Sequence, residues 1–458
     1  MAASAFADDS QTVRPNFVFI LADDLGATDL GVQGSKFYET PNIDRLAREG
    51  MRFTQAYSAC TVCSPTRAAI LTGRYPARLH ITDWIKGHQR PRAKLAVPDW
   101  TMFLPHEEVT VAEVLHEAGY ATASIGKWHL GGPEFYPEKQ GFDVNLGGCD
   151  RGQPPSYFSP YKIPTLTDGP VGEFLTDREG AEAVKWITAH RDQLFFLYLP
   201  SHAVHTPLMG KTNLVAKYRA KADPASPQRN PTYAALVESL DDSVGRVLRA
   251  LEDLKLAERT VVIFTSDNGG LLGGPKNPIT SNLGLRAGKG SAYEGGVRVP
   301  LIVRWPGVTQ PGSVCPVPVI SVDYFPTMLQ IAGLKTPRGL TIDGESLVPL
   351  LRQEGGWMRE AIFWHYPHYH PGGATPYGAI RSGDWRLVEF YEDGRVELFN
   401  LRDDPTEKTD LASTMPDRAM QLRQQLKSWR AKVGAQMPTP NPKYDSAKDT
   451  FGDAPPRK

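Results

Sequence analysis

Residues 60–74 read Cys-Thr-Val-Cys-Ser-Pro-Thr-Arg-Ala-Ala-Ile-Leu-Thr-Gly-Arg, and this stretch determines the fold class that the remaining chain must fit. Pro65 follows Cys63 by two residues, and proline is favoured in a first helical turn because the N–H that it lacks would have no partner there. The stretch therefore predicts a helix that begins at Cys63 and stops at Thr72-Gly73. The free N–H groups and aligned peptide dipoles at that helix start favour a thiolate or a bound oxyanion, and Arg67 adds positive charge.

Two other chemistries fit the pair of cysteines at 60 and 63, namely a redox dithiol and half of a zinc site. A zinc site needs a second pair of ligands, but the other cysteines are the solitary Cys149 and Cys315, which disfavours zinc. A redox dithiol fits the local pattern. It leaves the proline and arginines of the stretch unexplained, and it needs a small thioredoxin-like unit that this long chain does not resemble.

The pattern Cys63-x-Pro65-x-Arg67, continuing as Leu71-Thr72-Gly73-Arg74, resembles the signature of the type I sulfatases in the alkaline phosphatase superfamily. In that family the cysteine is oxidised after translation to a formylglycine, whose hydrated aldehyde is the nucleophile. The resemblance implies that Cys63 is such a precursor, and that a formylglycine-generating enzyme or an anaerobic sulfatase-maturating enzyme acts on the chain. Thr66 departs from the pattern, since serine is common at that position.

Composition is that of a large globular enzyme. The 458 residues are 41% apolar, which suffices for a sizeable core, and Lys+Arg equals Asp+Glu at 51 each. Because no net field results, we expect no nucleic-acid partner and only local recognition of anions. The longest apolar runs, 17–22 and 194–199, are too short to span a bilayer, so we expect a soluble protein without a membrane span.

The N-terminus carries a weak targeting signal. Ala5-Phe6-Ala7 followed by Asp8-Asp9 resembles a signal-peptidase site, although the charged and apolar regions that should precede it are missing. We interpret residues 1–15 as the remnant of a trimmed signal peptide, which predicts a periplasmic or secreted protein, or else as a disordered tail.

Short apolar runs alternate with helical patterns, which predicts an α/β fold with a large, mainly parallel sheet sandwiched by helices over residues 16–355. The resemblance makes this domain alkaline phosphatase-like. We expect strands at 16–22, 121–125, 194–199 and 259–265, and helices at 42–49, 109–118, 176–190 and 233–254. Residues 356–437 predict a smaller antiparallel sheet with a closing helix, and the Pro-rich residues 438–458 predict a surface strap or a disordered tail.

Two of the predicted strands end in pairs of oxygen ligands, Asp23-Asp24 and Asp267-Asn268. Such residues are also ordinary in turns, so neither pair alone indicates a site. Carboxyl ends of parallel strands meet at one edge of a sheet, and three carboxylates with an amide oxygen suit Ca²⁺ or Mg²⁺. The resemblance implies one divalent cation, Ca²⁺ before Mg²⁺, that also contacts the residue formed from Cys63.

Further catalytic residues follow from the resemblance. Lys127 and His129, within Gly-Lys-Trp-His-Leu-Gly, match a motif whose lysine binds sulfate and whose histidine holds the formylglycine hydrate. His205 stands two residues before a proline, which selects it over His202 as the acid that protonates the leaving oxygen. Lys289, in the Gly-rich block 286–300, matches the second sulfate-binding lysine, and Arg67 neutralises developing charge beside the nucleophile.

Substrate contacts are assigned to a mixed polar and aromatic set. The candidates are Asp83, Trp84, His88, Arg90, Asp150, Arg151, His365 and His368. Aromatic faces stack on sugar rings while the polar side chains bond hydroxyls, so we expect a small sulfated saccharide before an aryl sulfate. Three alternatives stay open: a broad arylsulfatase, a phosphonate monoester or phosphodiester hydrolase, and a sulfoglycan-binding protein with unmodified Cys63.

Overall fold

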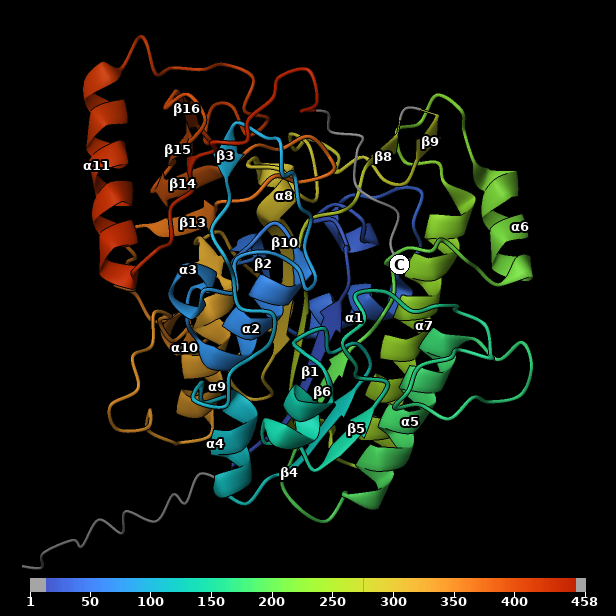
Figure 1. Ribbon diagram of the computed structural model, residues 1–458. Helices are drawn as coiled ribbons and strands as arrows, with labels where there is room; N and C mark the ends of the chain where they lie inside the picture. Colours follow the sequence, from blue (N-terminus) through green and yellow to red (C-terminus); the bar gives the residue numbers. More distant parts are fainter. Residues whose placement is uncertain (1–13, 275, 450–458) are drawn as a thin grey trace, which may run out of the picture.

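The computed structural model describes residues 14–274 and 276–449, and a nine-stranded sheet forms its centre (Figure 1). The strand order is β11-β2-β10-β7-β1-β6-β4-β5, and β12 pairs with β2 as well. The strands of this sheet are β1 (Asn16–Ala22), β2 (Met51–Tyr57), β4 (Ala121–Ile125), β5 (Val144–Leu146), β6 (Phe195–Pro200), β7 (Thr260–Ser266), β10 (Arg298–Arg304), β11 (Ser313–Cys315) and β12 (Val319–Ile320).

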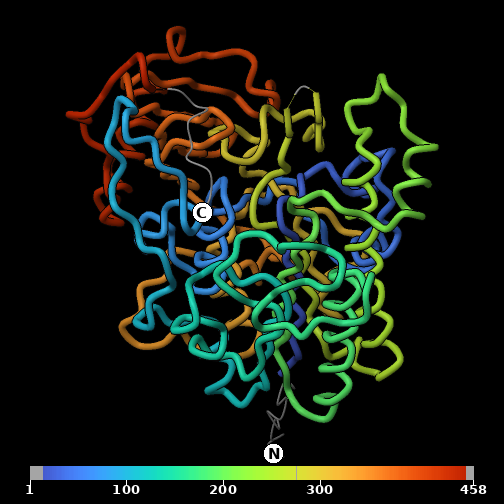
Figure 2. Tube along the Cα trace, turned by 45° about the vertical axis from the view of Figure 1, so that its right-hand side comes forward, coloured from blue at the N-terminus to red at the C-terminus, as the bar shows by residue number. Residues whose placement is uncertain are grey.

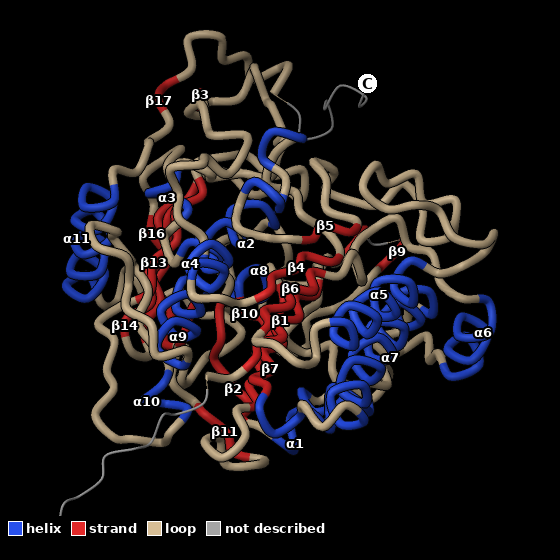
Figure 3. Tube along the Cα trace, turned by 90° about the horizontal axis from the view of Figure 1, so that it is seen from below, coloured by secondary structure: helices blue, strands red, loops and turns tan. Residues whose placement is uncertain are grey.

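Helices cover both faces of the sheet (Figure 3). One face packs against α1 (Pro41–Glu49), α5 (Leu175–Ala189) and α7 (Pro231–Asp253), and the other against α2 (Cys63–Thr72), α4 (Val111–Glu117) and α9 (Tyr324–Ile331). Strand β1 serves both cores: Val18 and Ile20 belong to the first, Phe17 and Phe19 to the second. A strand buried on both faces reads as a continuous apolar run, which is how the sequence predicted it. The shorter helices are α3 (Pro76–Leu79), α6 (Thr212–Lys221), α8 (Glu294–Val297) and α10 (Val348–Leu351).

Strand direction brings the functional loops to one edge. Strands β4, β6, β1 and β7 are parallel, whereas β10 runs antiparallel to both β7 and β2. The carboxyl ends of the parallel strands therefore meet at the edge where β10 begins. The sequence analysis did not predict β2 or β10. Strand β10 carries Pro300, which is tolerated because the register shifts between Val299 and Leu301.

The C-terminal part forms the predicted antiparallel sheet, which is separate from the large one. Its strands are β13 (Ile362–Tyr366), β14 (Tyr377–Ser382), β15 (Trp385–Phe390) and β16 (Val396–Asn400), with α11 (Pro416–Val433) packed beside them. One hydrophobic cluster joins this sheet to the segment before α2, because Trp364 and Leu398 share a core with Tyr57 and Val62. No helix in the described part of the chain is long and apolar enough to cross a membrane.

The chain after α11 runs back to the segment around β3. Strand β17 (Thr439–Pro440) pairs with β3 (Leu95–Ala96), and the two are labelled side by side in Figure 3; in Figure 2 the orange-red part of the chain lies against the light-blue loop. The Asn441 side-chain amide donates to the carbonyl groups of Pro91 and Ala93. Strands β8 (Gly273–Gly274) and β9 (Asn277–Pro278) form a separate two-stranded antiparallel ribbon. The predictions for residues 1–13 and 450–458 lie outside the described residues.

Candidate active site

Six segments meet at the carboxyl edge of the large sheet. The loops after β1, β4, β6 and β7 supply the predicted Asp, Lys and His residues, and α2 begins with Cys63 six residues after β2. The loop that precedes β10 supplies Lys289 from the opposite direction, since β10 is antiparallel to β7. The strand order alone therefore explains why residues more than 200 positions apart form one cluster.

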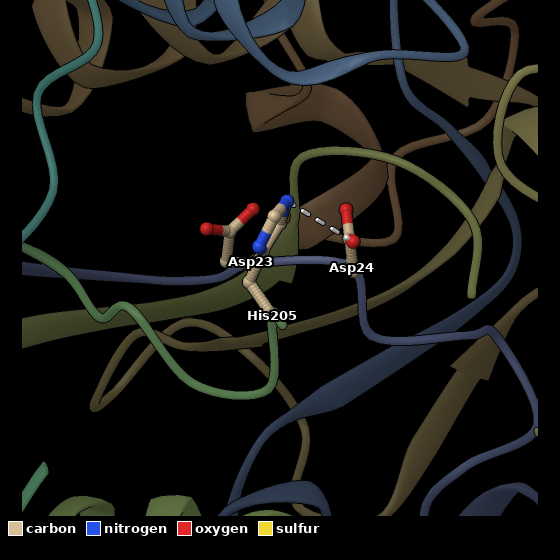
Figure 4. A group of neighbouring side chains, drawn as sticks. All are labelled: Asp23, Asp24 and His205. Carbon is tan, nitrogen blue, oxygen red and sulfur yellow. Dashed lines mark ion pairs between the residues drawn. The ribbon is translucent and has the colours of Figure 1, made fainter. Parts of the chain in front are cut away.

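The strand-end carboxylates lie in direct contact. The N–H of Asp24 donates to Asp267 Oδ1 at 3.1 Å, and Asn268 Nδ2 donates to Asp24 Oδ1 at 2.8 Å. Lys127 Nζ donates to Asp23 Oδ2 at 2.7 Å, and Lys289 Nζ forms an ion pair with Asp24 Oδ1 at 2.6 Å. Figure 4 shows the Asp23 and Asp24 carboxylates on either side of His205, whose Nε2 lies 3.5 Å from Asp24 Oδ2.

The donor set of this cluster fits a divalent cation. One oxygen each of Asp23, Asp24 and Asn268 is buried without a hydrogen-bond partner, although buried carboxylate and amide oxygens are normally satisfied. Burial, with the neighbouring carboxylates of Asp267 and Asp24, raises the pKa of Asp23 to about 8 even though Lys127 and Arg67 oppose the rise. Asp23, Asp24 and His205 also offer atoms within 4.8 Å of one another. Oxygen donors predominate, and these favour Ca²⁺ or Mg²⁺ over zinc.

Arg67 connects the helix to the carboxylates. It is completely buried, donates from Nε to Asp267 Oδ2 at 2.9 Å, and lies 3.6 Å from Asp23 Oδ1. Its Nη1 donates to the Lys127 carbonyl at 3.1 Å. A buried guanidinium between two carboxylates holds them in a fixed geometry, and the pair with Asp267 keeps the pKa of that carboxyl group below its usual value in spite of burial.

Cys63 begins α2, as the sequence predicted, and its side chain is buried. Burial raises the pKa of the Cys63 thiol, and the charges of Lys127 and Lys289, which favour a thiolate, do not reverse that. Cys60 is likewise buried, with a raised pKa. All four cysteines are free thiols. A redox dithiol needs an accessible thiol of low pKa, so this structure does not support that alternative.

His129 presents an unused acceptor near the nucleophile. Its Nε2 bonds the carbonyl of Ile85, which can only accept, so Nε2 carries the proton and Nδ1 is the acceptor. That Nδ1 is buried and has no partner among the described residues. The hydroxyl of Ser64 donates to the His129 carbonyl at 2.9 Å, which ties this residue to the neighbour of Cys63.

His205 lies beside the second lysine. Lys289 Nζ is 3.1 Å from His205 Nε2, and the Thr206 carbonyl is 2.7 Å from Nδ1. Burial, assisted by Lys289 and opposed by Asp24, lowers the pKa of His205 to about 3. A neutral imidazole cannot act as an acid, so the predicted role requires protonation in the substrate complex, where a sulfate adds negative charge. That role stays a prediction.

The predicted substrate contacts fall into two groups. Trp84 and His88 lie with ring centroids 6.4 Å apart, in the segment that also bonds His129. The backbone around Asp150 and Arg151 contacts His129 through Cys149 and Gly152, but the Arg151 side chain donates to the Lys162 carbonyl at 2.7 Å. Arg90 instead pairs with Asp449 of the tail.

Asp83, His365 and His368 are buried and paired inside the protein, which argues against direct contact with substrate. Asp83 accepts from Tyr366 at 2.9 Å. The two ring nitrogens of His365 bond Tyr391 and Gln436, and His368 bonds Thr82.

Three supporting contacts were missed from the sequence. Ser64 Oγ accepts from the Ile85 N–H at 3.1 Å, so one serine joins the nucleophile segment to the segment of Trp84. Behind His205, the Tyr157 hydroxyl donates to the His205 carbonyl at 2.9 Å, and Glu179 bonds the His202 ring at 2.6 Å. No local motif signals such contacts, because each joins segments at least 20 residues apart.

A family model described as Sulfatase matches residues 15–334, which is more than half of the chain. The chain belongs to the sulfatase family. A second model, described as N-sulphoglucosamine sulphohydrolase, C-terminal, matches residues 288–432. The family lies within the alkaline phosphatase superfamily, and this member is a sulfuric ester hydrolase.

Three relatives show how far the similarity of this sulfatase extends. It is 35% identical to a sulfatase of Formosa agariphila, covering 97% of this chain and 95% of that one. It is 38% identical to human arylsulfatase A over 83% of this chain and 75% of that protein. The crystal structure of Ps i-CgsB in complex with k-i-k-neocarrahexaose is similar with a TM-score of 0.78 and 28% identity, over 97% of this chain and 98% of that chain.

Proposed function

We propose that this sulfatase hydrolyses a sulfate ester of a small carbohydrate through a formylglycine formed from Cys63, and releases inorganic sulfate. The main support for Cys63 as the precursor of the nucleophile is its position. It begins α2 at the carboxyl edge of the sheet, where the charges of Lys127 and Lys289 act on it. The buried Nδ1 of His129 supports a hydroxyl-bearing residue there, since a thioether or thiol gives it no good donor.

The charges of the site support an anionic substrate. Arg67, Lys127 and Lys289 match the three carboxylates Asp23, Asp24 and Asp267 one for one. A divalent cation held by these carboxylates and by Asn268 then leaves the site with surplus positive charge. When bound, this cation supplies Lewis-acid stabilisation of a sulfate oxygen. Ca²⁺ is the ion that we propose first, because several oxygen ligands at a rigid loop suit it.

We assign the remaining catalytic roles from the positions of the residues. The formylglycine hydrate supplies an oxygen nucleophile, and a second hydroxyl group later allows sulfate to leave with the aldehyde restored. Lys127, Lys289 and Arg67 neutralise charge that develops on the sulfuryl oxygens. His129 orients the hydrate through Nδ1. His205 donates a proton to the departing alcohol oxygen, and Tyr157 fixes its peptide.

A carbohydrate is supported by the surroundings and by a relative. Trp84 and His88 lie in the segment that contacts His129, and an aromatic face beside imidazole groups suits a sugar ring. Ps i-CgsB, which shares this fold over nearly the whole chain, has been crystallised with an oligosaccharide. Export to the periplasm or the medium and a maturating enzyme as partner remain part of this proposal.

The decisive experiment has two readouts. Intact mass of the peptide that spans residues 60–74 reports conversion of Cys63, since formylglycine is lighter than cysteine by the replacement of SH₂ with O. Rates are then measured on sulfated mono- and oligosaccharides, an aryl sulfate and an aryl phosphonate. Turnover of the phosphonate alone would contradict the sulfatase reaction, and binding without turnover by unmodified Cys63 would favour the sulfoglycan-binding alternative.

A further inference from the structure

His370 lies against the turn that carries Lys289. A Cβ atom built on Gly290 would be 2.0 Å from His370 Nδ1, so the ring packs directly on the backbone of the residue after Lys289. His370 comes from the segment after β13, about 80 positions further along the chain. The C-terminal sheet thus delivers an imidazole to the immediate neighbour of a catalytic lysine.

The local turn fixes which nitrogen of this ring is available. The Gly372 N–H donates to His370 Nδ1 at 3.0 Å, and the Gly373 N–H donates to the His370 carbonyl at 2.9 Å. Because Nδ1 accepts, the neutral ring carries its proton on Nε2. Burial, together with Lys289, lowers the pKa of His370 to about 3, which keeps the ring neutral. No residue in the described ranges accepts a hydrogen bond from Nε2.

The indole of Trp84 forms the second wall. Its ring centroid is 5.4 Å from that of His370, with the planes at 74°, and it is only partly buried. The next residue, Ile85, bonds both Ser64 and His129, as described above. The two rings are therefore connected to the active site through different residues: Trp84 through Ile85, which bonds Ser64 and His129, and His370 through Gly290, the neighbour of Lys289.

We infer that Trp84 and His370 form the subsite for the sugar ring of the sulfate ester, in which the indole stacks on the apolar face of the ring and His370 Nε2 donates a hydrogen bond to a hydroxyl group. This inference rests on the proposed function, which it deepens by naming the residues that select the alcohol. His370 is then a specificity determinant, because an aryl sulfate has no hydroxyl group to accept its proton, whereas an aryl ring can still stack on Trp84.

The variant His370→Ala tests the assignment on two substrates. We expect kcat/KM for a sulfated monosaccharide to fall about three- to tenfold, the effect of one net hydrogen bond, and kcat/KM for 4-nitrophenyl sulfate to change less than twofold. His370→Gln, which keeps a donor, restores part of the loss. The control His116→Ala removes an exposed imidazole of α4 and leaves both substrates unaffected.

Deoxy analogues of the sugar identify the accepting hydroxyl group. In the wild-type enzyme, removal of the accepting hydroxyl group should lower kcat/KM by about the same factor as the His370→Ala substitution does on the parent sugar. In His370→Ala, the same deoxy analogue should be cleaved with the same kcat/KM as the parent sugar. Trp84→Ala lowers kcat/KM for both substrates, and the control Trp357→Ala, distant on the chain with its indole N–H bonded to Ser346, lowers neither.

Two results would overturn the subsite. The first is that His370→Ala lowers kcat/KM equally for the sugar sulfate and the aryl sulfate; the second is that every deoxy analogue loses as much kcat/KM in His370→Ala as it does in the wild-type enzyme. Failure of the converted wild-type enzyme to cleave any sulfate ester would instead contradict the proposed function itself.

Discussion

Glu407 is a buried carboxyl group whose ionisation is predicted to make stability depend on pH. It is fully buried between β16 and α11, and its Oε2 accepts from the Glu294 N–H at 2.7 Å. Arg386 Nε lies 3.2 Å from Glu407 Oε1 but makes no hydrogen bond to it. The other two nitrogens of this guanidinium donate elsewhere, Nη1 to Glu294 Oε1 at 3.0 Å and Nη2 to the Ala292 carbonyl at 2.6 Å. Burial raises the pKa of Glu407 from 4.5 to about 8; Arg386 opposes the rise and Glu294 adds to it.

The sign of the pH dependence follows from proton linkage. Between about pH 4.5 and pH 8 the unfolded chain has released the Glu407 proton, whereas the folded chain keeps it. The free energy of unfolding therefore decreases as pH rises through this range, with a limit of about 1.4 kcal/mol per pH unit for one proton. Glu407→Gln has a similar shape and cannot ionise, so it lacks this contribution.

Urea unfolding of wild type and Glu407→Gln at pH 5, 6, 7 and 8 measures the contribution. We expect the stability of the variant relative to wild type to increase by about 3 kcal/mol from pH 5 to pH 8, which is what proton linkage gives for a pKa that rises from 4.5 in the unfolded chain to about 8 in the folded one. Glu354→Gln, at an exposed position, serves as the control, and we expect its stability relative to wild type to be the same at pH 5 and at pH 8. Two curves that stay parallel across this range for Glu407→Gln and wild type would refute the reasoning.

Three further predictions concern the site. Adding Ca²⁺ at 100 times its Kd should stabilise the fold by about 2.7 kcal/mol in thermal unfolding, and Asp24→Ala should remove that gain together with turnover; a gain that survives would exclude Asp24 as a ligand. His205→Ala should reduce turnover of sugar sulfates far more than that of activated aryl sulfates, whose phenolate needs little protonation, and an equal loss in kcat would refute the acid. Arg67→Met should cost about 3–5 kcal/mol in chemical unfolding, because Asp267 then lies buried without its partner, and a loss below 1 kcal/mol would show that the pair is dispensable.

Local patterns were enough to predict the centre of the fold. The sequence predicted β1 with its observed bounds and α7 within two residues at each end, because a doubly buried strand and a long amphipathic helix have strong local patterns. It did not predict β10, whose Pro300 interrupts the strand pattern and is accommodated only by the bulge opposite β2. The parallel strands explain why Asp23, Asp24, Asp267 and Asn268 could be grouped from the sequence alone.

The substrate-facing residues could not be separated by local pattern. Asp83 and Trp84 are adjacent, yet the first is buried against Tyr366 and the second is partly buried beside His370. Both outcomes depend on segments almost 300 positions away, which no local period encodes. His365 and His370 likewise belong to one aromatic run, but the His365 ring bonds Tyr391 and Gln436, whereas His370 opens a turn and its ring packs on Gly290 beside Lys289.

The predicted boundary between residues 355 and 356 separates sheets but does not separate function. Lys289 stands five residues before Glu294, whose carboxylate is completely buried and bonded to Arg386 of the small sheet at 3.0 Å. Arg386 also bonds the Ala292 carbonyl, and Glu407 bonds the Glu294 N–H, so both hold the backbone of the Lys289 segment. A buried carboxylate that loses its cation is strongly destabilised. Because the small sheet supplies that cation, the position of Lys289 depends on the C-terminal part, and the two sheets form one catalytic unit.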